Sequence, residues 1–260
     1  MKRALLYTFV FLCIQVAASM LVGLIAGRFP ALSSAMTQII TMVVFSVTTM
    51  IVFIKTKWAE ASWSYMKSRP WLVLLWCVVA ACGTIIPSVF LQDLLPEWPA
   101  AIQQLTREAE AQMYELLGTR GGYFVVCLLA PVAEELVFRG AVLRALLQWR
   151  PGNAWLMIVV SALIFAIVHL NPDQMPHAFL AGLLLGWMYM RTGSVIPGIA
   201  FHWANNTITY FIARMYSDPN TQLVDIFGSQ TRVLLAVAFS LLILVPALYQ
   251  LNVWMKRDKR

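Results

Sequence analysis

Long apolar runs, each close to the length that crosses a lipid bilayer, follow one another along most of this 260-residue chain. A membrane-spanning helix needs about 20 mostly apolar residues. The runs that approach or exceed this length cover residues 4–27, 35–54, 71–91, 121–148, 154–169, 177–190, 194–216 and 232–254. We therefore predict an all-α fold, a polytopic transmembrane helical bundle of about eight spans, which forms one integral-membrane domain over residues 1–260.

The composition excludes a soluble enzyme. Apolar and aromatic residues make up 60% of the chain and charged residues only 12%, whereas an average soluble domain has about 45–50% and about 25%. The formal net charge of +7 does not indicate a nucleic-acid partner, because Lys and Arg gather in the cytoplasmic loops of membrane proteins. The partner that the composition predicts is the lipid bilayer.

The distribution of basic residues predicts the orientation. If the N-terminus is cytoplasmic, 13 of the 19 Lys and Arg residues fall on the cytoplasmic side, five fall on the other side, and Arg139 lies inside the fourth run. This bias predicts an even number of spans, with both the N- and C-termini cytoplasmic, in a multi-pass protein of the cell membrane. The first run follows Lys2 and Arg3, as in a signal peptide, but it is longer than the about 7–15 apolar residues of such a peptide, so we expect a retained span.

The longest loop, 92–120, lies on the outer side in this orientation. Apolar residues from Ile102 to Leu116 recur at helical spacing, with Glu108, Glu110 and other charges between them. This pattern predicts an amphipathic helix in the membrane interface. A connector between spans explains such a helix more simply than a functional lid does.

The fourth run contains three ionisable residues, Glu134, Glu135 and Arg139. Such groups are costly inside a membrane and usually mark a functional interior. Arg139 follows Glu135 by four residues, the favourable order for an ion pair on one helix. Glu134 points about 100° away and has no such partner, so it is the candidate general base. In the structural alternative, all three residues form one buried network that braces the bundle.

Two histidines extend this set. His169 ends the fifth run, whereas His202 and Asn206 are four residues apart in the seventh and share a helix face. Glu134 could take a proton from water while His202 and Asn206 stabilise the oxyanion. Equally, Glu134, His169 and His202 form a competent zinc set with one position left for water. Spacing leaves the metal-dependent and metal-independent mechanisms open. His177 opens a span near the interface, and we expect a boundary residue there.

Three ordered motifs carry a family resemblance: Glu134-Glu135-x-x-x-Arg139, Phe165-x-x-x-His169 and His202-x-x-x-Asn206. In this respect the chain resembles the CPBP family of intramembrane proteases, which includes CAAX proteases and the bacteriocin-processing Abi proteins. The resemblance covers about residues 125–206, within a motif-bearing core at about 121–212. It implies that Glu134 activates water, that His169, His202 and Asn206 position water or metal and stabilise the oxyanion, and that Glu135 and Arg139 support them.

The sequence thus predicts an intramembrane (metallo)endopeptidase of the CAAX-protease type that hydrolyses a peptide bond in a membrane-associated protein or peptide. Two alternatives use the same buried polar cluster. A transporter would use it as a proton or metal pathway, although the chain lacks the internal repeats of many transporters. A non-catalytic scaffold or immunity protein would use it only to hold helices together. The sequence indicates no oligomeric state.

Overall fold

The computed structural model describes the chain except residues 30, 61–62, 96–98, 217, 219–220 and 256–260. Helices and their connecting loops build the described residues, with no β-strand among them. The helices outside the fourth predicted span are α1 (Lys2–Ala26), α2 (Ser34–Lys55), η1 (Trp63–Ser68), α3 (Trp71–Asp93), α4 (Ala100–Leu117), η4 (Pro151–Asn153), α8 (Ala154–Ile167), α9 (Met175–Thr192), α10 (Ile196–Met215), α11 (Leu223–Phe227) and α12 (Gln230–Trp254). The all-α prediction is confirmed.

The fourth predicted span is a run of five helical segments, which we call the composite helix (residues 120–149). Its segments are α5 (Arg120–Tyr123), the π-helix η2 (Phe124–Leu129), α6 (Ala130–Val137), the π-helix η3 (Phe138–Leu143) and α7 (Arg144–Trp149). A helix lies in each of the other seven predicted ranges as well. Of the described helices, α1, α2, α3 and α12 are long and apolar enough to cross a membrane. The chain is therefore an integral membrane protein, and the count of eight spans stays a prediction.

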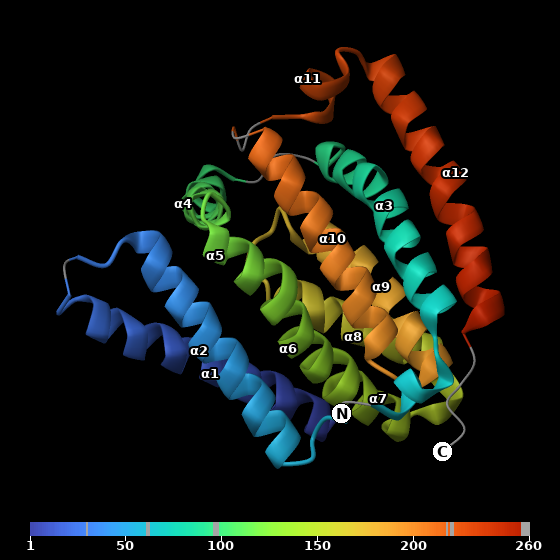
Figure 1. Cartoon of the computed structure of the whole chain (residues 1–260), viewed down its shortest axis with the longest axis horizontal. Coiled ribbons are helices and arrows are strands. Elements are labelled where there is room, and N and C mark those ends of the chain that lie inside the picture. Colours follow the sequence, from blue (N-terminus) through green and yellow to red (C-terminus); the bar gives the residue numbers. More distant parts are fainter. Residues whose placement is uncertain (30, 61–62, 96–98, 217, 219–220, 256–260) are drawn as a thin grey trace.

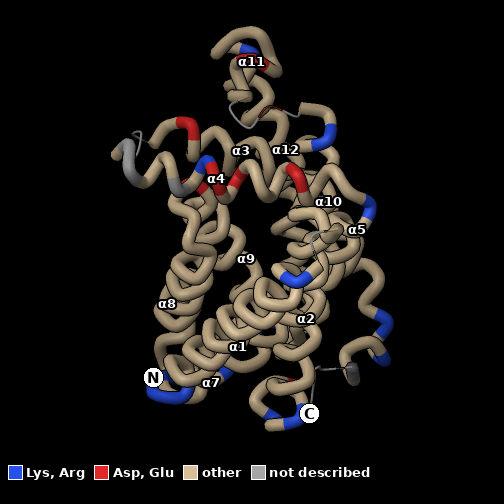
Figure 2. Tube along the Cα trace, turned by 90° about the vertical axis from the view of Figure 1, so that its left-hand side faces the viewer, with Lys and Arg blue, Asp and Glu red and all other residues tan. Residues whose placement is uncertain are grey.

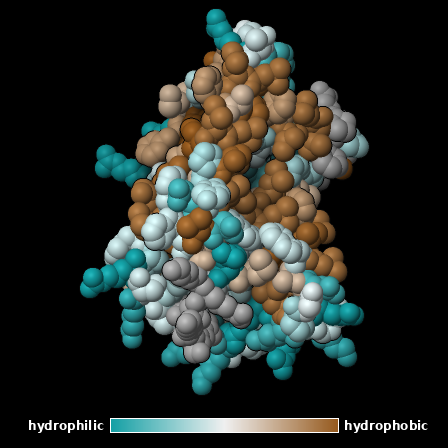
Figure 3. Space-filling view, turned by 90° about the vertical axis from the view of Figure 1, so that its right-hand side faces the viewer, coloured by the Kyte–Doolittle hydropathy of each residue, from teal (hydrophilic) through white to brown (hydrophobic). Residues whose placement is uncertain are grey.

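The outer surface of the bundle suits a lipid environment. Figure 3 shows a broad hydrophobic area on the side of the molecule that α12 occupies. On α12, Phe239 is 66% exposed and Leu242 is 69% exposed. Apolar patches of this extent on a water-soluble monomer are rare. We infer that these side chains face lipid tails.

The helices are arranged around α10. It packs against α3 and α9 and against the composite helix, while α12 covers α3 on one flank and the α1–α2 hairpin covers the composite helix on the other (Figure 1). Most of the acidic residues lie at the end where α4 and α11 lie, whereas α1 begins at the opposite end (Figure 2). Helix α12 ends at that same end as the start of α1 (Figure 1). An even number of spans requires the start of α1 and the end of α12 to lie on the same side of the membrane. That this side is the cytoplasmic one stays a prediction.

Close packing of α3 against α12 depends on Gly83. A Cβ added there would lie 2.8 Å from the Leu244 backbone nitrogen and 2.9 Å from its Cα. Because backbone atoms cannot move aside as a flexible side chain can, we expect Gly83→Ala to lower the free energy of unfolding by about 1–3 kcal/mol. The thermal unfolding midpoint of the detergent-purified protein measures this.

Gly23 on α1 provides the matched control. A Cβ there meets no atom within 4 Å, and alanine is favoured over glycine in a helix by about 0.8–1 kcal/mol. Gly23→Ala should therefore leave the midpoint unchanged or raise it. Equal midpoints for the two variants would contradict close contact between α3 and α12.

Candidate active site

A local irregularity connects the composite helix to α10. Within η2 the backbone N–H of Ala130 donates to the carbonyl of Val125, five residues earlier. In that register the Val126 carbonyl would accept from Pro131, which has no N–H. Asn206 on α10 supplies the missing donor, since its Nδ2 lies 3.0 Å from the Val126 oxygen. Asn206 on α10 is thus hydrogen-bonded to the composite helix just before the Glu134-Glu135 pair.

The predicted pair of Glu135 and Arg139 is confirmed. Arg139 Nη1 lies 2.9 Å from Glu135 Oε1, and both side chains are buried. The same guanidinium donates to the Gly182 carbonyl at 3.4 Å and stands over the Phe165 ring, 4.3 Å from its centroid. Sequence spacing did not predict one further contact: His202 Nδ1 lies 3.2 Å from Glu135 Oε1. Glu135, on α6, therefore contacts Arg139 within the composite helix and also His202 on α10.

Glu134 is separate from this ion pair. Its Oε2 is buried and has no hydrogen-bond partner among the described residues. The structure places His202 beside it, with Nε2 3.8 Å from that oxygen, beyond hydrogen-bond length. A buried carboxylate oxygen without a donor is costly unless water or substrate pairs with it. Glu134 thus has an oxygen that is free to bind water.

His169 lies just beyond the fifth predicted helix rather than on it. Helix α8 ends at Ile167, and Leu170 adopts a φ of 53°, which ends the helical turn. His169 Nδ1 lies 2.7 Å from the Phe165 carbonyl oxygen. A carbonyl only accepts, so Nδ1 carries the proton and Nε2 of the neutral ring is an acceptor. This hydrogen bond fixes the tautomer of His169.

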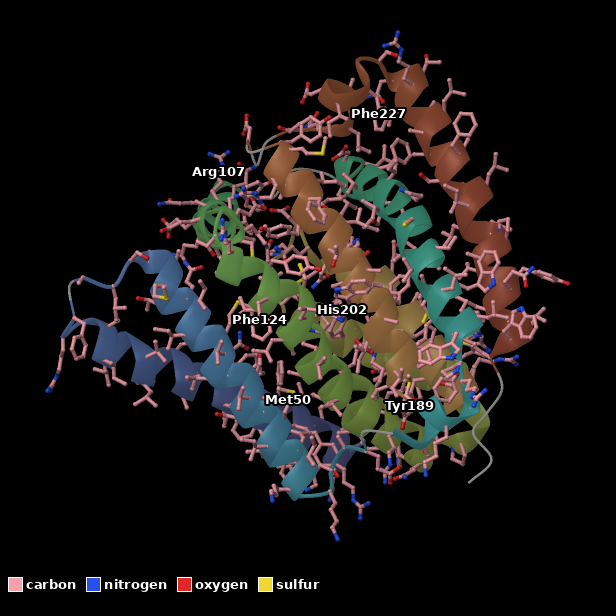
Figure 4. The ribbon with its side chains drawn as sticks, in the orientation of Figure 1. Met50, Arg107, Phe124, Tyr189, His202 and Phe227 are labelled. Atoms are coloured by element: carbon pink, nitrogen blue, oxygen red, sulfur yellow. The ribbon has the colours of Figure 1, made fainter. Side chains whose placement is uncertain are left out.

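One cavity brings the four predicted catalytic residues together. It has a volume of about 320 Å³, and Glu134, His169, His202 and Asn206 all line it. His202 lies near the middle of the bundle, on the side of α10 that faces the composite helix (Figure 4). Most of the remaining wall is apolar, with side chains from α3, α4 and α9. The site is therefore a mainly apolar pocket with a few polar groups, the usual form of a small-molecule or peptide site.

A helix, α4, lies within 92–120, where the sequence predicts an amphipathic helix, and its place on the outer side stays a prediction. It lies across one end of the bundle (Figure 2), where Met113 and Leu117 line the cavity. Glu115 Oε1 accepts a hydrogen bond of 3.3 Å from the backbone N–H of Ala35, at the start of α2. Helix α4 thus contributes to the cavity wall.

A pH effect follows from the position of α4. Burial, together with the nearby negative charge of Asp173, raises the pKa of the Glu110 carboxyl, and Arg107 opposes this. A raised folded-state pKa means that the folded protein binds more protons than the unfolded chain. This contribution to stability is present below about pH 4, the ordinary glutamate value, and is lost as the pH rises through the raised value. Glu110→Gln should therefore raise the unfolding midpoint at pH 7 more than at pH 4.

Glu108, an exposed glutamate on the same helix, is the control for this measurement. Glu108→Gln should raise the midpoint at pH 7 by less than Glu110→Gln does. If Glu110→Gln shows no larger gain at pH 7 than at pH 4, then Glu110 is not held against the residues around Asp173.

The zinc set needs a separate test. Glu134, His169 and His202 line the same cavity, but no three His, Cys, Asp or Glu side chains in the described ranges are grouped so that they could hold a metal ion. The donors as placed do not form a metal centre. The zinc set therefore stays a prediction.

Sequence reasoning missed one part of the cavity wall. His177, expected as a boundary residue, lies in hydrogen-bond contact with Ser88 of α3 and Asn205 of α10, and all three line the cavity. Its partners are 89 and 28 residues away in the chain. No local spacing could have indicated these contacts.

The comparison with protein families agrees with the motifs. Residues 118–208 match the family model described as "Type II CAAX prenyl endopeptidase Rce1-like". The matched segment contains all three motifs, from Glu134 to Asn206, and confirms the family resemblance. No curated protein and no solved structure matches the chain.

Proposed function

We propose that this integral membrane protein, which matches the Rce1-like CAAX endopeptidases over residues 118–208, is an intramembrane endopeptidase with Glu134 as its general base. Its substrate would be a membrane-associated protein or peptide. One observation supports the proposal above all: Glu134 has a buried oxygen without a partner in the cavity that His169, His202 and Asn206 also line. Glu135, one residue away, is instead paired with Arg139.

The first step is attack by water. A water molecule in the cavity donates one hydrogen bond to Glu134 Oε2 and the other to His169 Nε2. Glu134 takes the first proton as the water oxygen bonds to the carbonyl carbon of the substrate. The carbonyl π electrons move to its oxygen, which becomes the oxyanion of a tetrahedral intermediate.

Two donors stabilise that oxyanion. Asn206 Nδ2 has two hydrogens, of which the Val126 carbonyl takes one, and the other is available. His202 supplies Nε2–H when it is protonated, while its Nδ1–H faces Glu135. Glu134 then returns its proton to the leaving nitrogen, and the C–N bond breaks.

The experiment uses detergent-purified protein and a fluorogenic peptide library. The library includes peptides with and without an isoprenylated C-terminal cysteine, because the matched family is described as prenyl endopeptidases. Each assay is run with and without a chelator, and metal content is measured on the same sample. We expect cleavage that survives chelation. Loss of cleavage on chelation, with one metal ion per chain, would instead support the zinc set Glu134, His169 and His202.

The transporter and scaffold alternatives predict different results. A transporter would move protons or metal ions into proteoliposomes without cleaving any peptide. A scaffold would show neither property, and its Glu134→Gln variant would keep the cellular phenotype. We prefer the peptidase because a purely bracing role does not account for the unpaired oxygen of Glu134, whereas a water-binding base requires it.

A further inference from the structure

A chain of hydrogen bonds crosses the cavity wall outside the three motifs. Asn205 Nδ2 on α10 lies 3.0 Å from His177 Nε2 on α9. His177 Nδ1 lies 2.8 Å from Ser88 Oγ on α3, and Ser88 Oγ lies 2.8 Å from the Ile85 carbonyl oxygen. Three helices therefore contribute to one polar chain, which we call the His177 relay (Asn205, His177, Ser88).

The direction of every bond in the His177 relay follows from its last acceptor. The Ile85 carbonyl can only accept, so it takes the single hydroxyl hydrogen of Ser88. Ser88 Oγ must then accept from His177, which places the ring proton on Nδ1. Nε2 is left with a lone pair and accepts from Asn205. The relay thus fixes the Asn205 carboxamide with its nitrogen toward His177 and its oxygen away from it.

That oxygen has no partner. Asn205 is only 4% exposed, and its Oδ1 is buried without a hydrogen bond in the described protein. Asn205 nevertheless lines the cavity, three residues after His202 and thus on a neighbouring part of the same helix face. A buried carboxamide oxygen without a donor costs free energy, so its position indicates a ligand that brings a donor.

We propose, on the basis of the endopeptidase function above, that Asn205 is a substrate-binding residue whose Oδ1 accepts a hydrogen bond from a backbone N–H of the bound peptide. An extended peptide in a largely apolar cavity has N–H groups that need acceptors. In the proposed mechanism Glu134 and His169 bind water, whereas His202 and Asn206 act as hydrogen-bond donors. None of these four accepts a hydrogen bond from a peptide N–H, and Asn205 Oδ1 supplies that acceptor. His177 and Ser88 are positioning residues, because they hold the carboxamide in one orientation.

The test removes the proposed hydrogen bond in two ways, by replacing the peptide N–H and by replacing the Asn205 carboxamide. The probe is the library peptide that wild-type protein cleaves fastest, resynthesised with one backbone N–H at a time replaced by an ester oxygen, excluding the scissile bond. For wild-type protein, one such replacement should raise KM about tenfold with little change in kcat, the usual effect of one lost hydrogen bond. Asn205→Leu should raise KM about tenfold for the all-amide peptide and show no further rise with that ester.

Variants of Ser88 separate positioning from folding. Ser88→Ala leaves the carboxamide free to rotate, so it should raise KM with kcat unchanged and weaken the ester effect. Ser88→Thr keeps the hydroxyl and should restore both. The inference would be overturned if no ester replacement raised the KM of wild-type protein, or if Asn205→Leu showed the same rise in KM with the ester as wild type does. In either case, cleavage by wild-type protein would still support the proposed function. If wild type cleaves no peptide, the proposed function fails and the inference fails with it.

Discussion

Glu134→Gln is expected to lower kcat for peptide cleavage by roughly 10²–10⁴-fold, the range for loss of a general base, with KM little changed. Glutamine keeps the size and shape of the side chain but cannot take a proton from water. The fold should remain intact, because the structure gives Glu134 Oε2 no hydrogen bond to lose. Steady-state kinetics and the thermal unfolding midpoint of the same preparation measure both properties.

The control for this variant is Glu108→Gln. Glu108 is exposed on α4 and is not among the residues that line the cavity, so its replacement should leave kcat and KM unchanged. If Glu134→Gln retained wild-type kcat, water activation by Glu134 would be wrong. A loss of activity that came with a large drop in the unfolding midpoint would show that Glu134 is a structural residue.

The largest effect on stability is expected at Arg139. The Glu135–Arg139 pair is almost completely buried, at 0% and 1% exposure, and Arg139→Met would leave the Glu135 carboxylate buried without its guanidinium. Breaking a buried ion pair from one side costs about 3–5 kcal/mol. The free energy of unfolding in detergent should fall by that amount, although His202 still contacts Glu135.

Two further variants test whether the unpaired Glu135 carboxylate causes this loss of stability. Glu135→Gln combined with Arg139→Met removes both charges, and replacing a whole buried pair is often nearly neutral, so the double variant should recover most of the lost stability. Arg144 and Glu60 form a partly exposed pair at the same N–O distance of 2.9 Å. Because exposed pairs contribute about 0–1 kcal/mol, Arg144→Met should cost far less. Equal losses for Arg139→Met and Arg144→Met would contradict this account.

Local sequence patterns predicted the helices, because a helix depends mainly on residues that are close together in the chain. Long apolar runs gave α1, α2, α3 and α12 nearly to their ends. The Glu135–Arg139 contact was predictable for the same reason, since four residues on one helix bring the two side chains together. The end of α8 was not, because His169 lies in a turn where Leu170 adopts a left-handed conformation that leucine's preferences do not favour.

Contacts between helices could not be predicted from the sequence, because they join residues that are far apart in the chain. The His202–Glu135 contact joins residues 67 positions apart, and nothing in either helix indicates which carboxylate the ring would meet. The hydrogen bond from Asn206 to the Val126 carbonyl, which the π-helical register before Pro131 leaves available, likewise joins two distant segments. The part that α4 takes in the cavity wall likewise required its position over the bundle.

The most direct test of water activation by Glu134 is a single-turnover cleavage in H₂¹⁸O with enzyme in excess over peptide. Mass spectrometry of the product measures the oxygen that enters the new carboxylate. If Glu134 activates water, one ¹⁸O atom appears in the product of the first turnover, and Glu134→Gln yields almost no product. If the Glu134 carboxylate attacked the substrate itself and water then opened the resulting anhydride at the Glu134 carboxyl carbon, an unlabelled enzyme oxygen would reach the first-turnover product, and that result would contradict the mechanism.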